Sequence, residues 1–134
     1  MIGIVVISHG KFAEELISAV NFVLSAKPKI KMNAINLDRE VDFDAFKKEI
    51  KRNIKKADKG DGVLLVTDMF GGTPSNISLT FLEENKVEVI SGVNLPMLIK
   101  LATLPENTTL SESVRIAEKA GRDNIIVASN LIKK

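Results

Sequence analysis

The sequence alternates between two kinds of segment along its length, and this alternation limits the possible folds more than any other feature. Short runs rich in valine and isoleucine are bounded by turn residues, and longer stretches with apolar residues at helical spacing lie between them. The short runs lie at residues 2–7, 30–37, 63–67, 87–91 and 125–128. Strands that alternate with helices form a parallel sheet with helices on both faces. We therefore predict a doubly wound α/β fold.

The longer stretches predict five helices, which lie at residues 12–25, 43–57, 73–84, 95–104 and 111–120. We expect the side chain of Asp42 to cap the second helix. Thr73 is expected to be the N-cap of the third helix with Pro74 at its first helical position, and Gly121 is expected to end the fifth. Because the chain has 134 residues and neither a linker nor an internal repeat, we expect one domain that covers residues 1–134.

The composition excludes several classes of protein. The chain has no cysteine and one histidine, so disulfides are excluded and a metal site is not expected. A net charge of +2 is too balanced for a protein that binds nucleic acid phosphates. His9 and Lys11 interrupt the apolar N-terminal run before it reaches the length of a signal peptide or a membrane span, so we expect a cytoplasmic protein. A solvated helix face is the simplest interpretation of the lysine-rich stretch at residues 47–59.

Three of the predicted strands end in polar loops that contain glycine. These loops lie at residues 8–10, 67–76 and 91–96. The carboxyl ends of parallel strands meet at one edge of the sheet, where ligands bind. His9 ends the first strand, and Gly10 beside it leaves the imidazole uncrowded. Asp68 ends the third strand, so its carboxylate can hold one ring nitrogen and fix which nitrogen is the nucleophile.

The residues that follow the aspartate suit a bound anion. Gly71 and Gly72 allow the backbone to approach a ligand closely. Thr73 and Ser75 add hydroxyl groups at the start of a predicted helix, where backbone N–H groups are unpaired. Alone, this segment would be a well-made turn and helix cap. Together with the histidine and the aspartate, it predicts that a phosphoryl group is held here without a metal.

Two other kinds of site are excluded by inspection. The chain has neither of the glycine-rich motifs that bind nucleotides, so no nucleotide cofactor is expected. Ser8, His9 and Asp68 cannot form a hydrolase triad, because the side chains of adjacent residues on an extended strand point apart. The Gly-x-Ser-x-Gly motif of many hydrolases is also missing.

These residues resemble the enzyme IIA domain of the mannose family of the bacterial phosphoenolpyruvate-dependent sugar phosphotransferase system. Three motifs carry the resemblance in order along the chain, at residues 8–10, 68–76 and 91–98. The resemblance extends over essentially the whole sequence. It implies a mainly parallel sheet with one antiparallel edge strand, here at residues 125–128, and a homodimer that exchanges this strand.

The resemblance also implies a phosphoryl carrier. His9 would accept a phosphoryl group from the histidine-containing phosphocarrier protein and pass it to a IIB component, which phosphorylates a sugar during transport through the membrane components IIC and IID. The aspartate that matches Asp68 bonds the imidazole nitrogen that is not phosphorylated. Because the sequence ends at Lys134, we expect IIB on a separate chain and contact with the permease complex only through partners. The transported sugar leaves no trace in the sequence.

Three alternatives stay open. The phosphocarrier subunit of dihydroxyacetone kinase shares the fold and the histidine of the first strand, but lacks the Gly-Gly-Thr-Pro segment found at residues 71–74. A receiver domain would be phosphorylated on Asp68, but it needs an acidic cluster after the first strand to bind magnesium, and Ser8 and His9 are not acidic. A non-catalytic interaction module would use His9 only as a packed residue.

Overall fold

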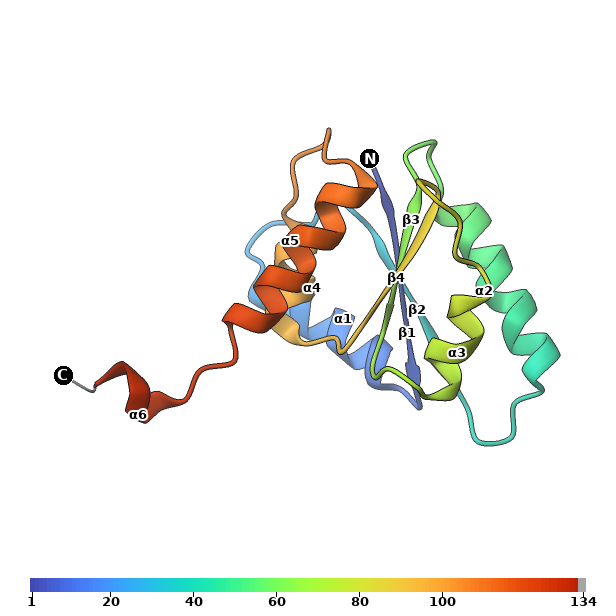
Figure 1. Ribbon diagram of the computed structural model, residues 1–134, viewed down its shortest axis with the longest axis horizontal. Coiled ribbons are helices and arrows are strands. Elements are labelled where there is room, and N and C mark those ends of the chain that lie inside the picture. The colour runs from blue at the N-terminus through green and yellow to red at the C-terminus, as the bar shows by residue number, and fades with distance from the viewer. Residues whose placement is uncertain (133–134) are drawn as a thin grey trace.

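The computed structural model describes residues 1–132, and its centre is a parallel sheet of four strands (Figure 1). The strands are β1 (Gly3–His9), β2 (Met32–Leu37), β3 (Val63–Thr67) and β4 (Val87–Ser91), in the order β2-β1-β3-β4. Ile7 of β1 lies beside Ile35 of β2 and Thr67 of β3, so the three strands reach the same edge. The strand order reverses between β1 and β3, the place where ligands bind in open α/β sheets. The parallel sheet predicted from the sequence is confirmed.

Helices cover both faces of this sheet (Figure 1). One face carries α1 (Phe12–Val23), α4 (Leu95–Ala102) and α5 (Leu110–Asp123), and the other carries α2 (Phe43–Ala57) and α3 (Thr73–Leu79). Along β1, Ile4 and Val6 pack against the first layer of helices, and Val5 and Ile7 pack against the second. Burial on both faces explains why the N-terminal run is continuously apolar and does not alternate with polar residues.

The predicted start of α2 is confirmed. The side chain of Asp42 accepts a hydrogen bond from the backbone N–H of Asp44 at 3.1 Å, which satisfies one of the unpaired donors of the first turn. Phe46 and Ile50 are fully buried against the sheet. None of the helices within residues 1–132 is both long and apolar enough to cross a membrane.

Four predicted helix ends differ from the structure: α1 and α4 each end two residues earlier than predicted, and the ends of α3 and α5 have identifiable causes. α3 ends at Leu79 and not near residue 84, because the N–H groups of Thr80 and Phe81 bond to carbonyls three residues earlier and tighten the chain into a turn. α5 continues through Gly121 to Asp123. A Cβ atom on Gly121 would lie 3.0 Å from the terminal methyl carbon of Met97 in α4, so this glycine allows two helices to pack closely and does not end one.

The antiparallel edge strand predicted at residues 125–128 is not present within the described part of this chain. After α5 the chain leaves the body of the fold and ends in the short helix α6 (Ala128–Leu131) (Figure 1). A strand needs a neighbouring backbone with which to share its hydrogen bonds, and this chain pairs none with residues 125–127. The side chains of Ile125, Ile126 and Val127 are exposed as a result.

Candidate functional site

His9 lies at the carboxyl end of β1, where the sheet meets the loop that leads into α1. Its side chain is 47% exposed, and its Nδ1 atom lies 2.7 Å from Oδ2 of Asp68, which follows β3. Gly10 turns the chain with a φ of +54°, a left-handed conformation that residues with a Cβ rarely adopt. The strand order therefore brings together two residues that are 59 positions apart in the sequence.

The Asp68 carboxylate is held by three hydrogen bonds. Oδ2 accepts from both the backbone N–H and the ring Nδ1 of His9, and Oδ1 accepts from the backbone N–H of Met69 at 2.9 Å. Burial, which leaves the side chain only 10% exposed, would raise the pKa of Asp68. The hydrogen bonds from His9 and Met69 outweigh that effect and hold the pKa of Asp68 below its ordinary value. The group is thus a fixed, ionised acceptor.

This arrangement defines the state of the His9 ring. An ionised carboxylate can only accept hydrogen bonds, so Nδ1 is the atom that carries the ring proton. In the neutral imidazole the lone pair then lies on Nε2, which has no hydrogen-bond partner within residues 1–132. The Asp68 carboxylate consequently fixes both the orientation of the ring and the nitrogen that can act as a nucleophile.

Gly72 lies directly against the free edge of the ring. A Cβ atom at this position would lie 2.8 Å from Cε1 of His9 and 3.4 Å from Nε2. Gly71 has a φ of +89°, which allows the loop to turn back toward β1. Gly72 is the N-cap residue of α3, one position earlier than predicted, so the start of α3 lies beside the nucleophilic nitrogen.

We predict that Gly72→Ala displaces the His9 ring without unfolding the protein. The ring is a half-exposed side chain and can give way to the added methyl group, whereas a buried backbone atom could not. A displacement near 1 Å from the productive geometry should slow phosphoryl uptake by roughly 100-fold. Rapid-quench kinetics should show this loss while the midpoint of thermal unfolding stays within a few degrees of the wild type. An unchanged rate would mean that the contact has no part in placing the ring.

The two hydroxyl residues predicted for phosphoryl binding lie in different environments. Thr73 is the first residue of α3 and is partly exposed. Ser75 is fully buried, and its Oγ lies 3.4 Å from Oγ of Ser91, which lies 2.5 Å from Oγ1 of Thr67. The structure therefore brings His9, Asp68, Gly72 and Thr73 together at one edge, whereas the Ser75 hydroxyl is buried against Ser91 at the end of β4.

Ser8 is a structural support of the site that sequence reasoning does not identify. Its side chain is fully buried, and Oγ accepts a hydrogen bond from the backbone N–H of Ala13 at 2.6 Å. This contact satisfies a donor in the first turn of α1 and ties the helix to the end of β1 directly beneath His9. A serine just before a helix is a recognisable signal for such capping, but here it lies three residues before the N-cap position.

Three apolar side chains flank the site in the chain, and we call them the apolar rim. They are Phe12, at the start of α1, and Met69 and Phe70, in the loop after β3, and all three are exposed, with Phe70 at 75%. Solvated loops do not favour such side chains, whereas the contact surfaces of protein partners are enriched in Phe and Met. The apolar rim therefore suits a site that another protein covers.

Comparisons with known proteins show what the chain is similar to. Residues 3–118 match the family described as the fructose IIA component of the sugar phosphotransferase system. The chain is 29% identical over 126 residues to the mannose-specific EIIAB component of the phosphotransferase system of Escherichia coli strain K12, a match that covers 92% of this chain and 38% of that protein. The chain thus spans well under half of that relative.

Two further matches cover almost the full length of both proteins compared. The chain is 23% identical over 135 residues to the fructose-specific EIIA component of the phosphotransferase system of Bacillus subtilis strain 168, covering 100% of this chain and 91% of that protein. The crystal structure of phosphotransferase system component EIIA from Streptococcus agalactiae superposes with a TM-score of 0.82 at 24% identity, covering 97% of this chain and 99% of the other. The second comparison establishes a shared fold.

Proposed function

The chain belongs to the mannose family of enzyme IIA components of the sugar phosphotransferase system, and on that premise we propose that it is a phosphoryl carrier whose acceptor atom is Nε2 of His9. His9 receives the phosphoryl group from the histidine-containing phosphocarrier protein and passes it to a IIB component, which phosphorylates a sugar that enters through the membrane components IIC and IID. The strongest support is the 2.7 Å contact between Nδ1 and Asp68, because it leaves Nε2 free at an exposed edge.

The transfer needs little from the protein beyond position and charge. The lone pair of Nε2 attacks phosphorus in line, the bond from phosphorus to the donor's imidazole nitrogen breaks, and the donor ring keeps that electron pair. Nδ1 of His9 keeps its proton, hydrogen bonded to Asp68, so the positive charge of the phosphorylated ring lies beside a carboxylate. In the second transfer the phosphoryl group passes to IIB, the bond between phosphorus and Nε2 breaks, and His9 returns to the neutral imidazole.

In this proposal the loop that opens α3 holds the phosphoryl oxygens. The first intrahelical hydrogen bond of α3 runs from the N–H of Asn76 to the carbonyl of Gly72 at 2.9 Å, so the N–H groups of Thr73 and Ser75 precede it and can donate to an anion. The Thr73 hydroxyl can add a further donor. Ser75 acts through its N–H, because its hydroxyl faces Ser91. Both glycines of the loop keep the approach to the ring open.

The apolar rim supports a protein, and not a small molecule, as the phosphoryl donor and acceptor. A partner that brings phosphorus within bonding distance of Nε2 must cover Phe12, Met69 and Phe70, and burial of these side chains would stabilise the encounter. The immobilised chain should therefore capture a IIB component from a lysate of its source. Capture of a dihydroxyacetone kinase subunit in its place would assign the chain to that system.

We also propose a homodimer formed through the C-terminal arm, residues 125–132. The arm extends from the fold (Figure 1), and its large apolar side chains are exposed in the single chain. These side chains are Ile125, Ile126, Val127, Leu131 and Ile132. A second copy can bury them and can supply the neighbouring strand that one chain does not offer. Sedimentation equilibrium should give about twice the mass of 14.7 kDa, and a single-chain mass at micromolar concentration would refute the dimer.

Phosphoryl uptake in solution tests the proposed function directly. In the presence of phosphoenolpyruvate labelled with radioactive phosphorus and the two general phosphotransferase proteins, the chain should take up label that survives alkali and is lost in acid, because it is bound to nitrogen. Omission of the histidine-containing phosphocarrier protein is the control and should prevent uptake. Label that is lost in alkali would indicate an acyl phosphate on Asp68, and no uptake at all would favour an interaction module.

A further inference from the structure

The outward half of α2 carries a concentration of positive charge, and we call the cations that form it the basic face. Its members are exposed cations of α2 and of the turn that follows it: Lys47, Lys48, Lys51, Arg52, Lys55, Lys56 and Lys59. At 3.6 residues per turn they occupy about half of the helix circumference. Phe46 and Ile50 mark the opposite side, which is buried against the sheet. The burial of α2 explains its apolar side, but it leaves unexplained why seven cations outnumber the two exposed carboxylates, Asp44 and Asp58, on the other side.

Among the described residues, the cations of the basic face form no ion pair. Lys29, Lys86, Lys119 and Arg122 each lie beside a carboxylate, but within residues 1–132 no nitrogen of the basic face lies within 4.0 Å of a carboxylate oxygen. The segment from residue 43 to residue 59 has seven cations against three carboxylates, a net charge of +4, whereas the whole chain has +2. The rest of the molecule is therefore net acidic, and the positive charge is concentrated on one helix.

This concentration of charge works against the stability of the helix. Cations four residues apart lie side by side on a helix and repel each other. The basic face contains five such pairs: 47 with 51, 51 with 55, 48 with 52, 52 with 56, and 55 with 59. Because no contact within the described chain offsets this repulsion, an external anionic surface is the natural source of compensation.

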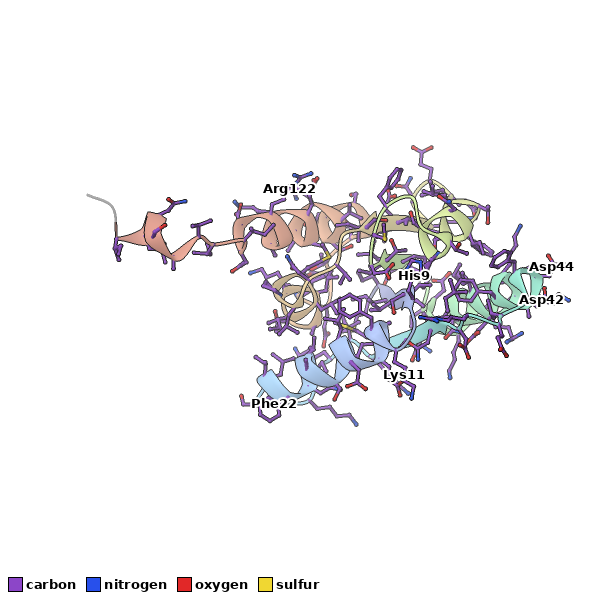
Figure 2. All side chains as sticks on the ribbon, turned by 90° about the horizontal axis from the view of Figure 1, so that it is seen from below. His9, Lys11, Phe22, Asp42, Asp44 and Arg122 are labelled. Atoms are coloured by element: carbon purple, nitrogen blue, oxygen red, sulfur yellow. The ribbon has the colours of Figure 1, made fainter. Side chains whose placement is uncertain are left out.

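The basic face and the edge that carries His9 point in different directions. Figure 1 shows α2 along the flank of the sheet, and Figure 2, which looks toward the edge with His9, shows α2 running out to one side, where Asp42 and Asp44 mark its first turn. A surface that contacts the basic face would therefore leave the His9 edge open to protein partners.

We propose that the basic face binds the surface of an anionic lipid bilayer. Six of its seven cations are lysines, and Phe43 at the start of α2 is the one exposed aromatic side chain of that helix, whereas the centres of protein interfaces are depleted of lysine and rely on aromatic anchors. A 15-residue helix is about 22 Å long, so it can present a row of these charges to a flat surface. Clusters of four to eight lysine and arginine residues on one helix are typical of binding to anionic lipids. The proposal is independent of the role given to His9.

Vesicle flotation tests this proposal on the full chain. At low ionic strength the protein should bind vesicles of phosphatidylglycerol and phosphatidylcholine but not vesicles of phosphatidylcholine alone, and about 0.5 M salt should release it. A variant with Lys48→Gln, Lys51→Gln and Lys55→Gln should bind anionic vesicles about 100-fold more weakly, because each cation near such a surface contributes a factor of roughly five.

A matched variant separates position from total charge. The exposed Lys27, Lys31 and Lys100 lie outside α2, and their replacement by glutamine changes the net charge by the same amount. This variant should bind anionic vesicles within about twofold of the wild type, and both variants should accept phosphoryl label in solution at the wild-type rate. Equal loss in the two variants, no binding to anionic vesicles, or tighter binding to duplex DNA than to vesicles at the same salt would each overturn the proposal.

Discussion

In the variant His9→Ala we expect no phosphoryl uptake at all. His9 is the only histidine, and without its ring the Asp68 carboxylate still accepts two hydrogen bonds, from the backbone N–H groups of residue 9 and Met69, which make it a poor nucleophile. The His9 side chain is half exposed, and its removal should leave the midpoint of thermal unfolding within a few degrees of the wild type. Phosphoryl label from phosphoenolpyruvate, counted on the purified chain, is the measurement.

The control for this variant is Phe22→Ala, near the end of α1, the helix that follows His9 in the chain. Its side chain is 91% exposed and lies far along the helix from the site, so uptake should stay at the wild-type level. If the His9→Ala protein still takes up label, another residue is the acceptor. Loss of that residual label in alkali would identify an acyl phosphate and would transfer the central role to Asp68.

Asp68→Ala should slow phosphoryl uptake by roughly 100-fold and should not abolish it. Without the carboxylate the ring loses its hydrogen bond at Nδ1 and can rotate, so Nε2 spends less time in line with the incoming phosphorus. The nucleophile itself remains. Rapid-quench measurement of the single-turnover rate should therefore give a slow but complete reaction. Complete loss equal to that of His9→Ala would contradict the orienting role given to Asp68.

Asp68→Asn separates orientation from charge. The amide oxygen can still accept a hydrogen bond from the ring, so this variant should react faster than Asp68→Ala and slower than the wild type. The pH dependence of the free energy of unfolding tests the charge of Asp68 separately. Because hydrogen bonds hold the pKa of Asp68 below its ordinary value, the carboxylate stays ionised above about pH 4. The ionised carboxylate therefore stabilises the fold above the pKa that Asp68 has in the unfolded chain, and this stabilisation is lost as the pH falls through the lower pKa of the folded state.

The general position of the site could be predicted because it depends on topology. The apolar runs identified β1 and β3 as buried parallel strands, and the ends of parallel strands meet at one edge whatever the details of packing. Topology alone therefore predicts that His9 and Asp68 lie close together, and Nδ1 of His9 lies 2.7 Å from Oδ2 of Asp68. The alternation of strands and helices likewise predicts that helices cover both faces of the sheet.

Other features depended on contacts between distant residues, which periodicity does not record. The contact between Gly72 and the His9 ring and the inward direction of the Ser75 hydroxyl arise from the way α3 packs beside β1 and β4. Glycine can end a helix or allow two helices to pack closely, and the sequence alone does not distinguish these two roles at Gly121. The missing strand at residues 125–128 has β-branched residues typical of a strand, but one chain offers no backbone beside it.

The site of phosphorylation on the His9 ring tests the account most directly. Nitrogen NMR of the chain labelled with ¹⁵N-histidine, recorded before and after reaction with phosphoenolpyruvate and the general phosphotransferase proteins, distinguishes the two ring nitrogens by their coupling to phosphorus. Because Asp68 holds Nδ1 and leaves Nε2 free, we predict that phosphorus is bonded to Nε2 while Nδ1 keeps its proton. Phosphorus bonded to Nδ1, or a His9 ring that stays unmodified while the protein takes up label, would contradict the account.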